Sequence, residues 1–454
     1  MKLLKLSEIA NFLDAKTNGE ADITSVAIDT RKVKKGSLFI CIKGERFDAH
    51  DFAKDAQKAG ASAVMAEKDV DVSCPVIVVE NTKDALLKLS GYYRSKFDIP
   101  VVALTGSVGK TTTKDFTHLV LSAEYNCIKT QGNLNNEIGM PQTLFSMEED
   151  TQAAVIEMGM NHFGEISNMV KEVKPTVAMI TNIGVSHIEN LGSRDGILKA
   201  KLEILEGLPK HSPLILNGDN DLLKTVKNAD YNIVFVGIEN EDCQFRAVDI
   251  CEKNLKTYFK IKYNDRLVSV TIPTIGIHNV YNALFAFAAG FFAGVNEQSS
   301  INALANYTPS GMRQKIVDFD GITVIEDCYN ASPDSMNAAI KTLLSLKAKK
   351  RIAVFADMLE LGESSDDLHY GVGKTVADSN IDFLLCYGEK AKFFSKGAIE
   401  NKMKNVFHFD DKKQLCEKLM QICEKGDAVT FKGSRGMKLE EVIQSFYERW
   451  KINE

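Results

Sequence analysis

The stretch VVALTGSVGKTTTK, residues 101–114, places an apolar run directly before a glycine-containing turn and the polar start of a helix. Gly106 and Gly109 let the backbone bend so that successive N–H groups face a phosphate, and the following helix adds its positive N-terminus. Lys110 can reach terminal phosphate oxygens, and Thr111 offers a hydroxyl ligand for magnesium. The stretch therefore predicts a phosphate-binding loop for a nucleoside triphosphate.

This loop departs from the general Walker pattern, because Leu104 stands where that pattern has its first glycine. We interpret it as a shorter variant. An incidental Gly-Lys-Thr turn is disfavoured by the strand before it and the helix after it. The residues expected to face the nucleotide are Thr105, Gly106, Ser107, Val108, Gly109, Lys110, Thr111 and Thr112.

Apolar runs alternate with helical patterns along the chain, which indicates α/β layers around mostly parallel sheets. Residues 99–310 carry VVALT, AAVIEM, TVAMITNI and PLILNGD, typical of buried parallel strands, followed by the more antiparallel-looking NIVFVG, TYFKIKY and LVSVTIP. Residues 1–98 contain the short strands SVAIDT, SLFICI, SAVMAE and VIVVE, and residues 311–454 resemble a small doubly wound sheet. Because 454 residues exceed one compact core, we expect three domains with these bounds.

Composition narrows the classes of function. The net charge of -6 and the dispersed basic residues give no field that would attract a polyanion, so nucleic acid is not an expected partner. The nine cysteines are scattered without a C-x-x-C pair and indicate reduced thiols in a cytosol. Glu8 and Asn11 interrupt the N-terminal apolar run, which argues against a signal peptide. The most apolar stretch, ALFAFAAGFFAGV, is shorter than the roughly 18 to 20 residues that span a bilayer and predicts a buried core helix.

Further candidate ligands follow strands of the central segment. Glu157 lies near the end of AAVIEM and His187 lies beyond TVAMITNI, at the sheet edge where ligand sites collect. A carboxylate and an imidazole near a phosphate loop suit Mg²⁺ that phosphate oxygens also hold, although a lone histidine is more often structural. The spacing of Lys199 and Lys201 in GILKAKLEIL by itself favours a solvated charged face.

Other strings continue beyond the loop: NLNNEIGMPQTL, EMGMNHFGEI, TNIGVSHIENLGS, KAKLEI, GIHNVYNAL, DCYNASPDSM and KGSRGMKLE. Together with TGSVGKTTTK they resemble the Mur ligase family from end to end. The resemblance implies an N-terminal UDP-binding domain, a central ATPase domain and a C-terminal Rossmann-like domain. EMGMNHFGEI and DCYNASPDSM resemble the member of the family that adds D-alanyl-D-alanine, whereas the D-N-P-R motif of an amino-acid-adding relative is not found.

The resemblance also implies ATP and two magnesium ions as cofactors. It assigns Lys110 to the ATP phosphates, Thr111 and Glu157 to one magnesium, and His187 to the second. It implies that Lys201 is carbamylated, because a neutral amine that captures carbon dioxide becomes an anionic oxygen ligand. On the nucleotide it implies Asn279 and Asn282 near adenine, and Arg313 and Asp327 near phosphate and ribose.

Substrate positions follow from the same resemblance. In the N-terminal segment, threonine replaces the commoner serine of D-S-R at Thr30, and Ala49 replaces the usual glycine of F-D-G-H. Taken without the resemblance, Arg31 and Arg46 would be read as ordinary surface ion pairs. The implied contacts to the UDP-linked substrate are Ser25, Asp29, Thr30, Arg31, Lys43, Gly44, Arg46, Phe47, His50, Asn133, Asn135 and Asn136. The implied contacts to the dipeptide are Asn330 and Ser332.

The implied reaction is ATP-dependent ligation of D-alanyl-D-alanine to UDP-N-acetylmuramoyl-tripeptide through an acyl phosphate, by a monomer in the bacterial cytoplasm during peptidoglycan synthesis. A P-loop kinase or motor ATPase would not need a UDP-sugar module. A non-enzymatic scaffold would be expected to lose Lys110, Glu157 or Lys201. The sequence leaves open lysine or diaminopimelate as the third residue, D-Ala-D-lactate or D-Ala-D-serine as alternatives, and the group that accepts the amine proton.

Overall fold

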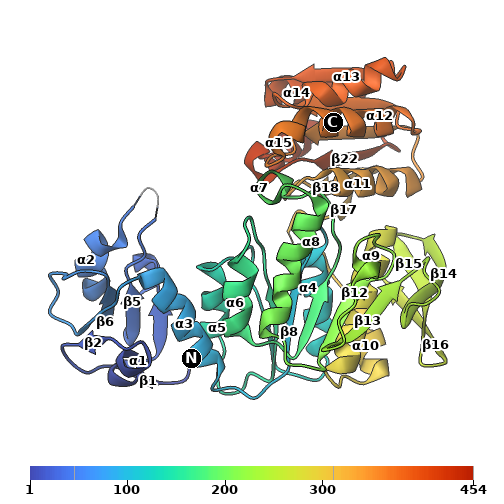
Figure 1. Cartoon of the computed structure of the whole chain (residues 1–454). Helices are drawn as coiled ribbons and strands as arrows, with labels where there is room; N and C mark the ends of the chain where they lie inside the picture. The colour runs from blue at the N-terminus through green and yellow to red at the C-terminus, as the bar shows by residue number, and fades with distance from the viewer. Residues whose placement is uncertain (45–46, 310, 453–454) are drawn as a thin grey trace.

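The computed structural model describes residues 1–44, 47–309 and 311–452 of the chain. Three α/β bodies, each built around its own large sheet, follow one another along the chain (Figure 1). The predicted fold class is therefore confirmed. The proposed boundaries at 98/99 and 310/311 stay predictions; each falls between the last strand of one large sheet and the first strand of the next.

The N-terminal domain is a five-stranded sheet in the order β2-β7-β6-β5-β4, parallel except where β2 pairs with β7. Its first helix buries Leu6, Ile9 and Ala10 on one face, as the amphipathic spacing predicts. The strands are β2 (Lys16–Thr17), β4 (Ser25–Ala27), β5 (Ser37–Ile40), β6 (Ala61–Ala66) and β7 (Val76–Val78), with a separate pair β1 (Leu4–Lys5) and β3 (Asp22–Ile23). The helices are α1 (Leu6–Phe12), α2 (Ala53–Lys58) and α3 (Thr82–Arg94).

The central domain has a nine-stranded sheet in the order β16-β15-β14-β13-β12-β11-β8-β10-β9. Strands from β9 to β14 pair in parallel, and β14, β15 and β16 form an antiparallel meander. The strands are β8 (Val101–Thr105), β9 (Cys127–Lys129), β10 (Ala153–Glu157), β11 (Val177–Ile180), β12 (Pro213–Asn217), β13 (Asn232–Gly237), β14 (Phe245–Lys253), β15 (Lys256–Tyr263) and β16 (Arg266–Ile272). Every residue of β8, β10 and β11 is buried, which fits their two-sided apolar sequences.

Helices cover both faces of this sheet. They are α4 (Lys110–Leu121), α5 (Gly139–Phe145), α6 (Glu165–Val173), α7 (Ile188–Leu191), α8 (Arg194–Leu202), α9 (Ile277–Phe292) and α10 (Glu297–Leu304). Helix α9 contains the most apolar stretch of the chain and packs beside α4 in the core, so the predicted buried helix is confirmed. No helix within the described residues is long and apolar enough to cross a bilayer. All nine cysteines are free thiols.

The C-terminal domain has a six-stranded sheet in the order β17-β18-β22-β19-β20-β21, parallel except for β17. Two apolar clusters cover its faces, as in a doubly wound sheet. The strands are β17 (Lys315–Phe319), β18 (Ile322–Asp327), β19 (Arg351–Ala356), β20 (Phe383–Tyr387), β21 (Val406–Phe409) and β22 (Ala428–Lys432). The helices are α11 (Pro333–Ser345), α12 (Ser365–Ala377), α13 (Lys392–Glu400), α14 (Lys412–Ile422) and α15 (Glu440–Ile452).

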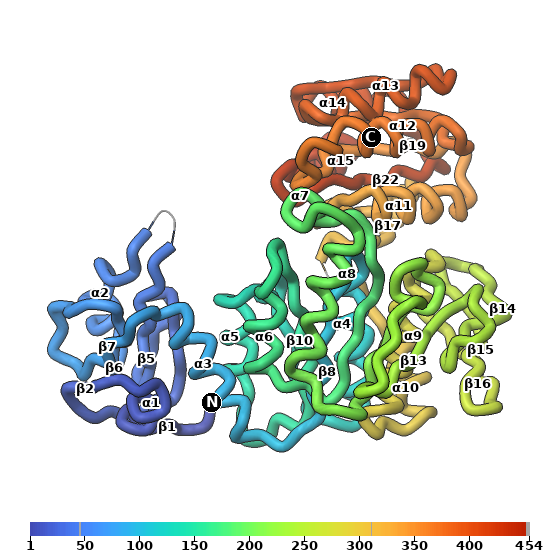
Figure 2. The backbone as a smooth tube through the Cα atoms, viewed as in Figure 1, coloured from blue at the N-terminus to red at the C-terminus, as the bar shows by residue number. Residues whose placement is uncertain are grey.

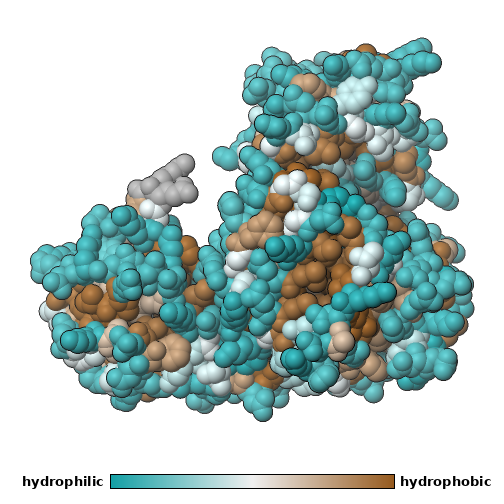
Figure 3. All heavy atoms as spheres, in the orientation of Figure 1, coloured by the Kyte–Doolittle hydropathy of each residue, from teal (hydrophilic) through white to brown (hydrophobic). Residues whose placement is uncertain are grey.

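The two domain junctions differ. Helix α3 packs on α5 and α6, where Tyr93 donates its hydroxyl to Met147 O at 2.7 Å and Arg94 Nε donates to Val173 O at 3.1 Å. The C-terminal domain touches the central domain near α7, which reaches up to it in the backbone trace (Figure 2). The space-filling view shows an open notch above the central domain, between the two outer domains (Figure 3).

Candidate functional site

A cavity of about 660 Å³ lies where strand ends of the central domain face the C-terminal domain. It brings together residues that are far apart in the sequence, as ligand sites in open α/β sheets do. The predicted site residues that line it are Ser107, Val108, Gly109, Lys110, Thr111, Thr112, Asn133, Asn135, Asn136, Glu157, His187, Asn279, Asn282, Arg313, Asp327, Asn330 and Ser332. Thr105, Gly106 and Lys201 are not among its lining residues.

The phosphate loop is held in shape by the segment that follows β11. An added Cβ at Gly106 would lie 1.9 Å from Thr181 Oγ1, so this close approach requires glycine. Gly109 is the N-cap residue of α4, and its φ of 83° lies in the left-handed region that glycine adopts most easily. Asn182 fixes the loop from the side, since its Oδ1 accepts the N–H of Val108 at 2.8 Å. The sequence did not single out Thr181 and Asn182, although both lie within the predicted strand TVAMITNI and directly follow β11 in the structure.

Lys110 folds back over this loop. Its Nζ donates to Gly106 O at 2.7 Å. Burial lowers the pKa of Lys110, and the nearby Arg313 adds to the effect. The carboxylate of Glu157 opposes part of this effect, and a polyphosphate at the loop would add further negative charge beside the amine.

Glu157 is the last residue of β10, and its side chain is 2% exposed. Its Oε1 accepts from Asn135 Nδ2 at 2.9 Å and from Thr111 Oγ1 at 3.2 Å. Lys114 Nζ lies 3.4 Å from Oε2, yet this oxygen accepts no hydrogen bond from the described residues. A buried carboxylate oxygen without a hydrogen bond, next to a threonine hydroxyl, fits a divalent cation. Lys114 was not predicted as a site residue from the sequence, although it lies one helical turn after Lys110.

Lys201 and His187 both lie close enough to Lys110 to feel its charge. Lys201 on α8 is 1% exposed, and burial together with the charge of Lys110 lowers the pKa of Lys201 well below its ordinary value. Among the described residues no group accepts a hydrogen bond from its amine, so its charged form is less favoured than in an exposed lysine. His187 has φ of 63°, and burial with the charges of Lys110 and Lys201 lowers the pKa of His187 to about 4. Its ring is therefore neutral near pH 7, and Nδ1 lies 3.5 Å from Glu360 Oε2 of the C-terminal domain.

Within the described ranges, no cluster of three or more His, Cys, Asp or Glu side chains forms a ready metal site. A cation here would need other donors: the hydroxyl of Thr111, the carboxylate of Glu157, the imidazole of His187 and oxygens of the nucleotide. An unpartnered neutral amine at Lys201 is the chemical form that can take up carbon dioxide. The donor set therefore fits a magnesium site of the predicted kind, and the carbamate stays a prediction.

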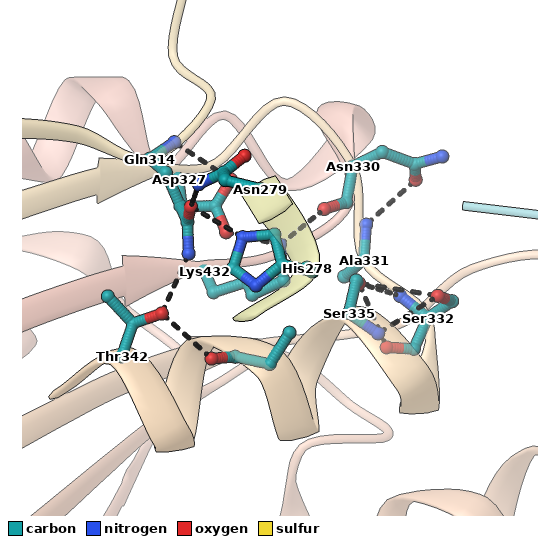
Figure 4. A network of polar contacts seen from close by, with 11 residues as sticks. His278, Asn279, Gln314, Asp327, Asn330, Ala331, Ser332, Ser335, Thr342 and Lys432 are labelled. Atoms are coloured by element: carbon teal, nitrogen blue, oxygen red, sulfur yellow. Dashed lines mark hydrogen bonds and ion pairs between the residues drawn. The ribbon is translucent and has the colours of Figure 1, made fainter. Parts of the chain in front are cut away.

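The residues predicted to lie near adenine are tied into the fold at the N-terminal half of α9. Asn282 Oδ1 accepts from Thr113 Oγ1 at 2.9 Å, which joins α9 to the helix of the phosphate loop. Asn279 Nδ2 donates to Ile275 O at 2.8 Å. It also donates to Gln314 Oε1 at 2.9 Å (Figure 4). Gln314, which sequence reasoning missed, thus links α9 to the C-terminal domain.

The C-terminal residues reach the cavity from the ends of β18 and β22. Lys432 Nζ donates to Asp327 Oδ2 at 2.7 Å (Figure 4). The guanidinium of Arg313 stacks 4.0 Å from the ring centroid of Tyr329, which holds the cation beside an aromatic face. Ser332 precedes α11 as its N-cap. Lys432 and Tyr329 were also missed by sequence reasoning.

The residues predicted for the UDP-linked substrate lie apart from this cavity, in the N-terminal domain, except for the three asparagines. Asp29 forms an ion pair with Arg31 at 2.6 Å, and hydrogen bonds from Arg31 lower the pKa of Asp29 to about 2. The Arg31 side chain is 87% exposed, so its guanidinium is accessible to a ligand. Ser25 Oγ lies 2.8 Å from Ser37 Oγ, and Thr30 follows Asp29 in a short 3-10 turn.

The second half of this set lies between Lys43 and His50. Gly44 N donates to Phe47 O at 2.9 Å, and the backbones of Lys43 and Asp48 form an isolated antiparallel β-bridge. The Phe47 side chain is 73% exposed. His50 is buried, with Nδ1 2.5 Å from Asp48 Oδ1 and Nε2 accepting the N–H of Glu67 at 2.9 Å. Both ring nitrogens are thus engaged within the domain, which suits a residue that shapes the turn. Arg46 lies outside the described residues.

Comparison with known proteins agrees with this geometry. Three family models match in succession: "Mur ligase family, catalytic domain" over residues 22–101, "Mur ligase middle domain" over 104–290 and "Mur ligase, glutamate ligase domain" over 312–435. The chain is 40% identical to the UDP-N-acetylmuramoyl-tripeptide–D-alanyl-D-alanine ligase of Bacillus subtilis strain 168, over 94% of this chain and 93% of that one. It is 36% identical to the ligase of the same name from Escherichia coli strain K12, with 98% of each chain covered.

Solved structures show the same likeness. A crystal structure of MurF from Acinetobacter baumannii superposes with a TM-score of 0.92 at 29% identity and covers 99% of both chains. The MurF ligase of Thermotoga maritima in complex with ADP superposes with a TM-score of 0.86 at 28% identity, covering 95% of this chain and 98% of that one. The chain therefore belongs to the Mur ligase family, in the branch whose curated members are named UDP-N-acetylmuramoyl-tripeptide–D-alanyl-D-alanine ligases.

Proposed function

We propose that this chain joins D-alanyl-D-alanine to UDP-N-acetylmuramoyl-tripeptide and hydrolyses ATP to ADP and phosphate in doing so. The observation that carries the proposal is the contact of Thr111 with Glu157 in a cavity that the phosphate loop shares with Asn330 and Ser332. Nucleotide and acceptor residues from two domains thus meet in one space. The reaction would occur in the bacterial cytoplasm, where the UDP-linked precursor is made.

In the first step the terminal carboxylate of the tripeptide attacks the γ-phosphorus of ATP. An O–P bond forms, the bond to the β-phosphate oxygen breaks, and an acyl phosphate and ADP result. Lys110 stabilises the charge that develops on the transferred group, because its ammonium sits at the mouth of the phosphate loop. The N–H groups of the loop and the N-terminus of α4 orient the phosphates.

Thr111, Glu157, His187 and a carbamylated Lys201 would hold the magnesium ions. When bound, the ions neutralise phosphate charge and orient its oxygens. Asn135 and Lys114 keep the Glu157 carboxylate in place. Support for the carbamate is the buried amine of Lys201, whose pKa is lowered and which lacks an acceptor among the described residues.

In the second step the amine of D-alanyl-D-alanine attacks the acyl carbonyl and an N–C bond forms. Phosphate leaves as the C–O bond breaks, and the nitrogen releases a proton. Acyl phosphates hydrolyse, so water has to be excluded while the dipeptide is held. The C-terminal domain carries Asn330 and Ser332, which line the same cavity as the phosphate loop. Its closure over the central domain would place these contacts and shield the intermediate.

The N-terminal domain would bind the UDP group, remote from the reacting carbonyl. Arg31 has an exposed guanidinium and suits a diphosphate, because a guanidinium can donate two parallel hydrogen bonds to the oxygens of one phosphate. Asn133, Asn135 and Asn136 would lie between this domain and the reaction centre.

The direct test is phosphate release by the purified protein with defined substrates. We expect release to require ATP, a UDP-muramoyl tripeptide and D-alanyl-D-alanine together, with one pentapeptide formed per phosphate. Tripeptides ending in lysine and in diaminopimelate are the two arms that identify the third residue. Release without the dipeptide, or phosphorylation of another acceptor, would contradict the proposal.

A further inference from the structure

Lys432 is the last residue of β22, and its side chain is only 3% exposed. Strand β22 pairs in parallel with β18, and the register places Lys432 opposite Asp327, the last residue of β18. Both residues therefore stand at the carboxyl edge of the C-terminal sheet, where α/β sheets bind ligands. A lysine is seldom buried unless it is paired, so its contacts identify its role.

The ammonium of Lys432 joins two segments that face the cavity. Its Nζ donates to Asp327 Oδ2 at 2.7 Å and to the backbone oxygen of Asn330 at 3.2 Å (Figure 4). Asp327 Oδ1 in turn accepts the N–H of Gln314 at 3.3 Å, and Gln314 Oε1 accepts from Asn279 Nδ2 at 2.9 Å. One side chain is thus connected to the proposed ribose contact, to the loop before α11 and to the adenine side of the central domain.

We infer that Lys432 is a positioning residue, which fixes Asp327 and the loop of residues 328–332 relative to each other so that one ammonium orients both the nucleotide and the incoming dipeptide. This inference rests on the proposed function. The loop has no regular secondary structure, and it carries Asn330 and Ser332. Without the ammonium, Asp327 would lose its charged partner and the Asn330 carbonyl would lose a donor, so both segments would be free to shift.

The same strand offers a matched control. Lys315 on β17 lies opposite Glu326 on β18, and its Nζ is 3.3 Å from Glu326 Oε2. Glu326 directly precedes Asp327 in the sequence, but the side chain of Lys315 is 53% exposed. Neither Lys315 nor Glu326 lines the cavity. Lys315→Met removes a lysine–carboxylate pair from the same sheet without touching the proposed site.

The experiment is steady-state kinetics of Lys432→Met and Lys315→Met with each substrate varied in turn. We expect Lys432→Met to raise the KM for ATP and the KM for D-alanyl-D-alanine each about tenfold, as loss of a residue that supports a binding contact does. The KM for the UDP-linked tripeptide should stay within about twofold, because its contacts lie on other domains. Lys315→Met should leave all three KM values within about twofold.

Chemical rescue tests the same idea without depending on one variant. Lys432→Ala vacates a space that opens to the cavity, and n-propylammonium carries the missing methylene groups and charge. Activity of Lys432→Ala should rise with propylammonium and not with tetramethylammonium at the same ionic strength. Unchanged KM values in Lys432→Met, a rise in all three KM values together, or no rescue would each overturn the inference. A wild-type protein without dipeptide-dependent phosphate release would instead refute the proposed function.

Discussion

Lys110 and Lys201 are two amines near the same phosphate loop, and burial lowers the pKa of each. Their surroundings nevertheless suit opposite roles. Lys110 opens onto the cavity, where a polyphosphate would stabilise its charge, whereas Lys201 is enclosed and the charge of Lys110 further lowers its pKa. One lysine is thus suited to neutralise phosphate, and the other to react as a free amine.

Replacing Lys110 by alanine should abolish ligation while the fold persists. A loop ammonium bonded to one carbonyl contributes little to stability, but it opposes the charge that develops during phosphoryl transfer. We expect turnover to fall by about a hundredfold or more and the melting temperature to change little. ADP formation and thermal melting are measured on the same preparation. Normal turnover with normal melting would remove the phosphate-loop assignment.

Replacing Lys201 by alanine should also give a nearly inactive protein, if its carbamate supplies an anionic ligand. We expect activity to fall by about a hundredfold and to recover with acetate or formate, which can occupy the vacated space, but not with chloride at matched ionic strength.

Lys199→Ala is the matched control for that experiment. Lys199 is exposed and its Nζ lies 5.8 Å from the ring centroid of Phe163, so it points away from the enclosed side of α8. We expect near-normal turnover from Lys199→Ala. The carbamate assignment is wrong if Lys201→Ala turns over normally, or if Lys199→Ala is the variant that carboxylates rescue.

At the scale of single elements, the strands that build the site were the most predictable part of the chain. Strands β8, β10 and β11 are buried on both faces, so their sequences are continuous apolar runs. Strand β14 was missed because only Phe245 and Ala247 of its 9 residues are buried, and β17 because it follows the hinge segment as a partly exposed edge strand.

The contacts between elements could not be predicted in the same way. The pairing of Lys432 with Asp327 joins residues 105 positions apart, and it exists only because β18 and β22 are neighbours in register. Lys114 reaches Glu157 only because α4 packs against β10. The family motifs identified Asp327 and Glu157 as site residues. Their partners Lys432 and Lys114 could be found only from the packing of strands and helices in the structure.

Helix α12 carries a pH-sensitive contact. His369 is fully buried, its Nδ1 lies 2.6 Å from Ser365 O, and its Nε2 accepts the N–H of Met358 at 2.9 Å. Burial lowers the pKa of His369 below its ordinary 6.5. The unfolded chain therefore takes up a proton that the folded chain does not as the pH falls through about 6.5, and stability decreases.

We expect the free energy of unfolding to fall less steeply with decreasing pH in His369→Gln than in the wild type, between about pH 7.5 and about pH 5.5. The slope is the readout, because the substitution itself will also lower the absolute stability. Denaturant unfolding at several pH values measures it. Parallel slopes in the two proteins would show that His369 does not contribute to the pH dependence.

At the scale of the whole molecule, substrate recognition and chemistry are assigned to separate domains. Arg31 is exposed in the N-terminal domain and does not line the cavity. Arg31→Ala should therefore raise the KM for the UDP-linked substrate, by about tenfold, and change turnover much less. The same expectation holds for Arg46→Ala. Initial rates over a range of UDP-linked substrate provide the measurement, and unchanged kinetics in both variants would count against the assignment of the UDP group to this domain.

The packing of α9 against α4 has a consequence for how the protein forms during its synthesis. The bond between Thr113 and Asn282 spans 169 positions, and Phe116, Val120 and Leu121 share a core cluster with α9. A ribosome must therefore add well over a hundred residues after α4 has emerged before the side of α4 that faces α9 can be covered. Throughout that interval the nascent central domain exposes this surface, whereas the N-terminal sheet, with its nearby strands, can already pair. Chaperone binding to stalled chains should accordingly be strongest for those that end before residue 277 and should decline once residues 277–292 have left the exit tunnel.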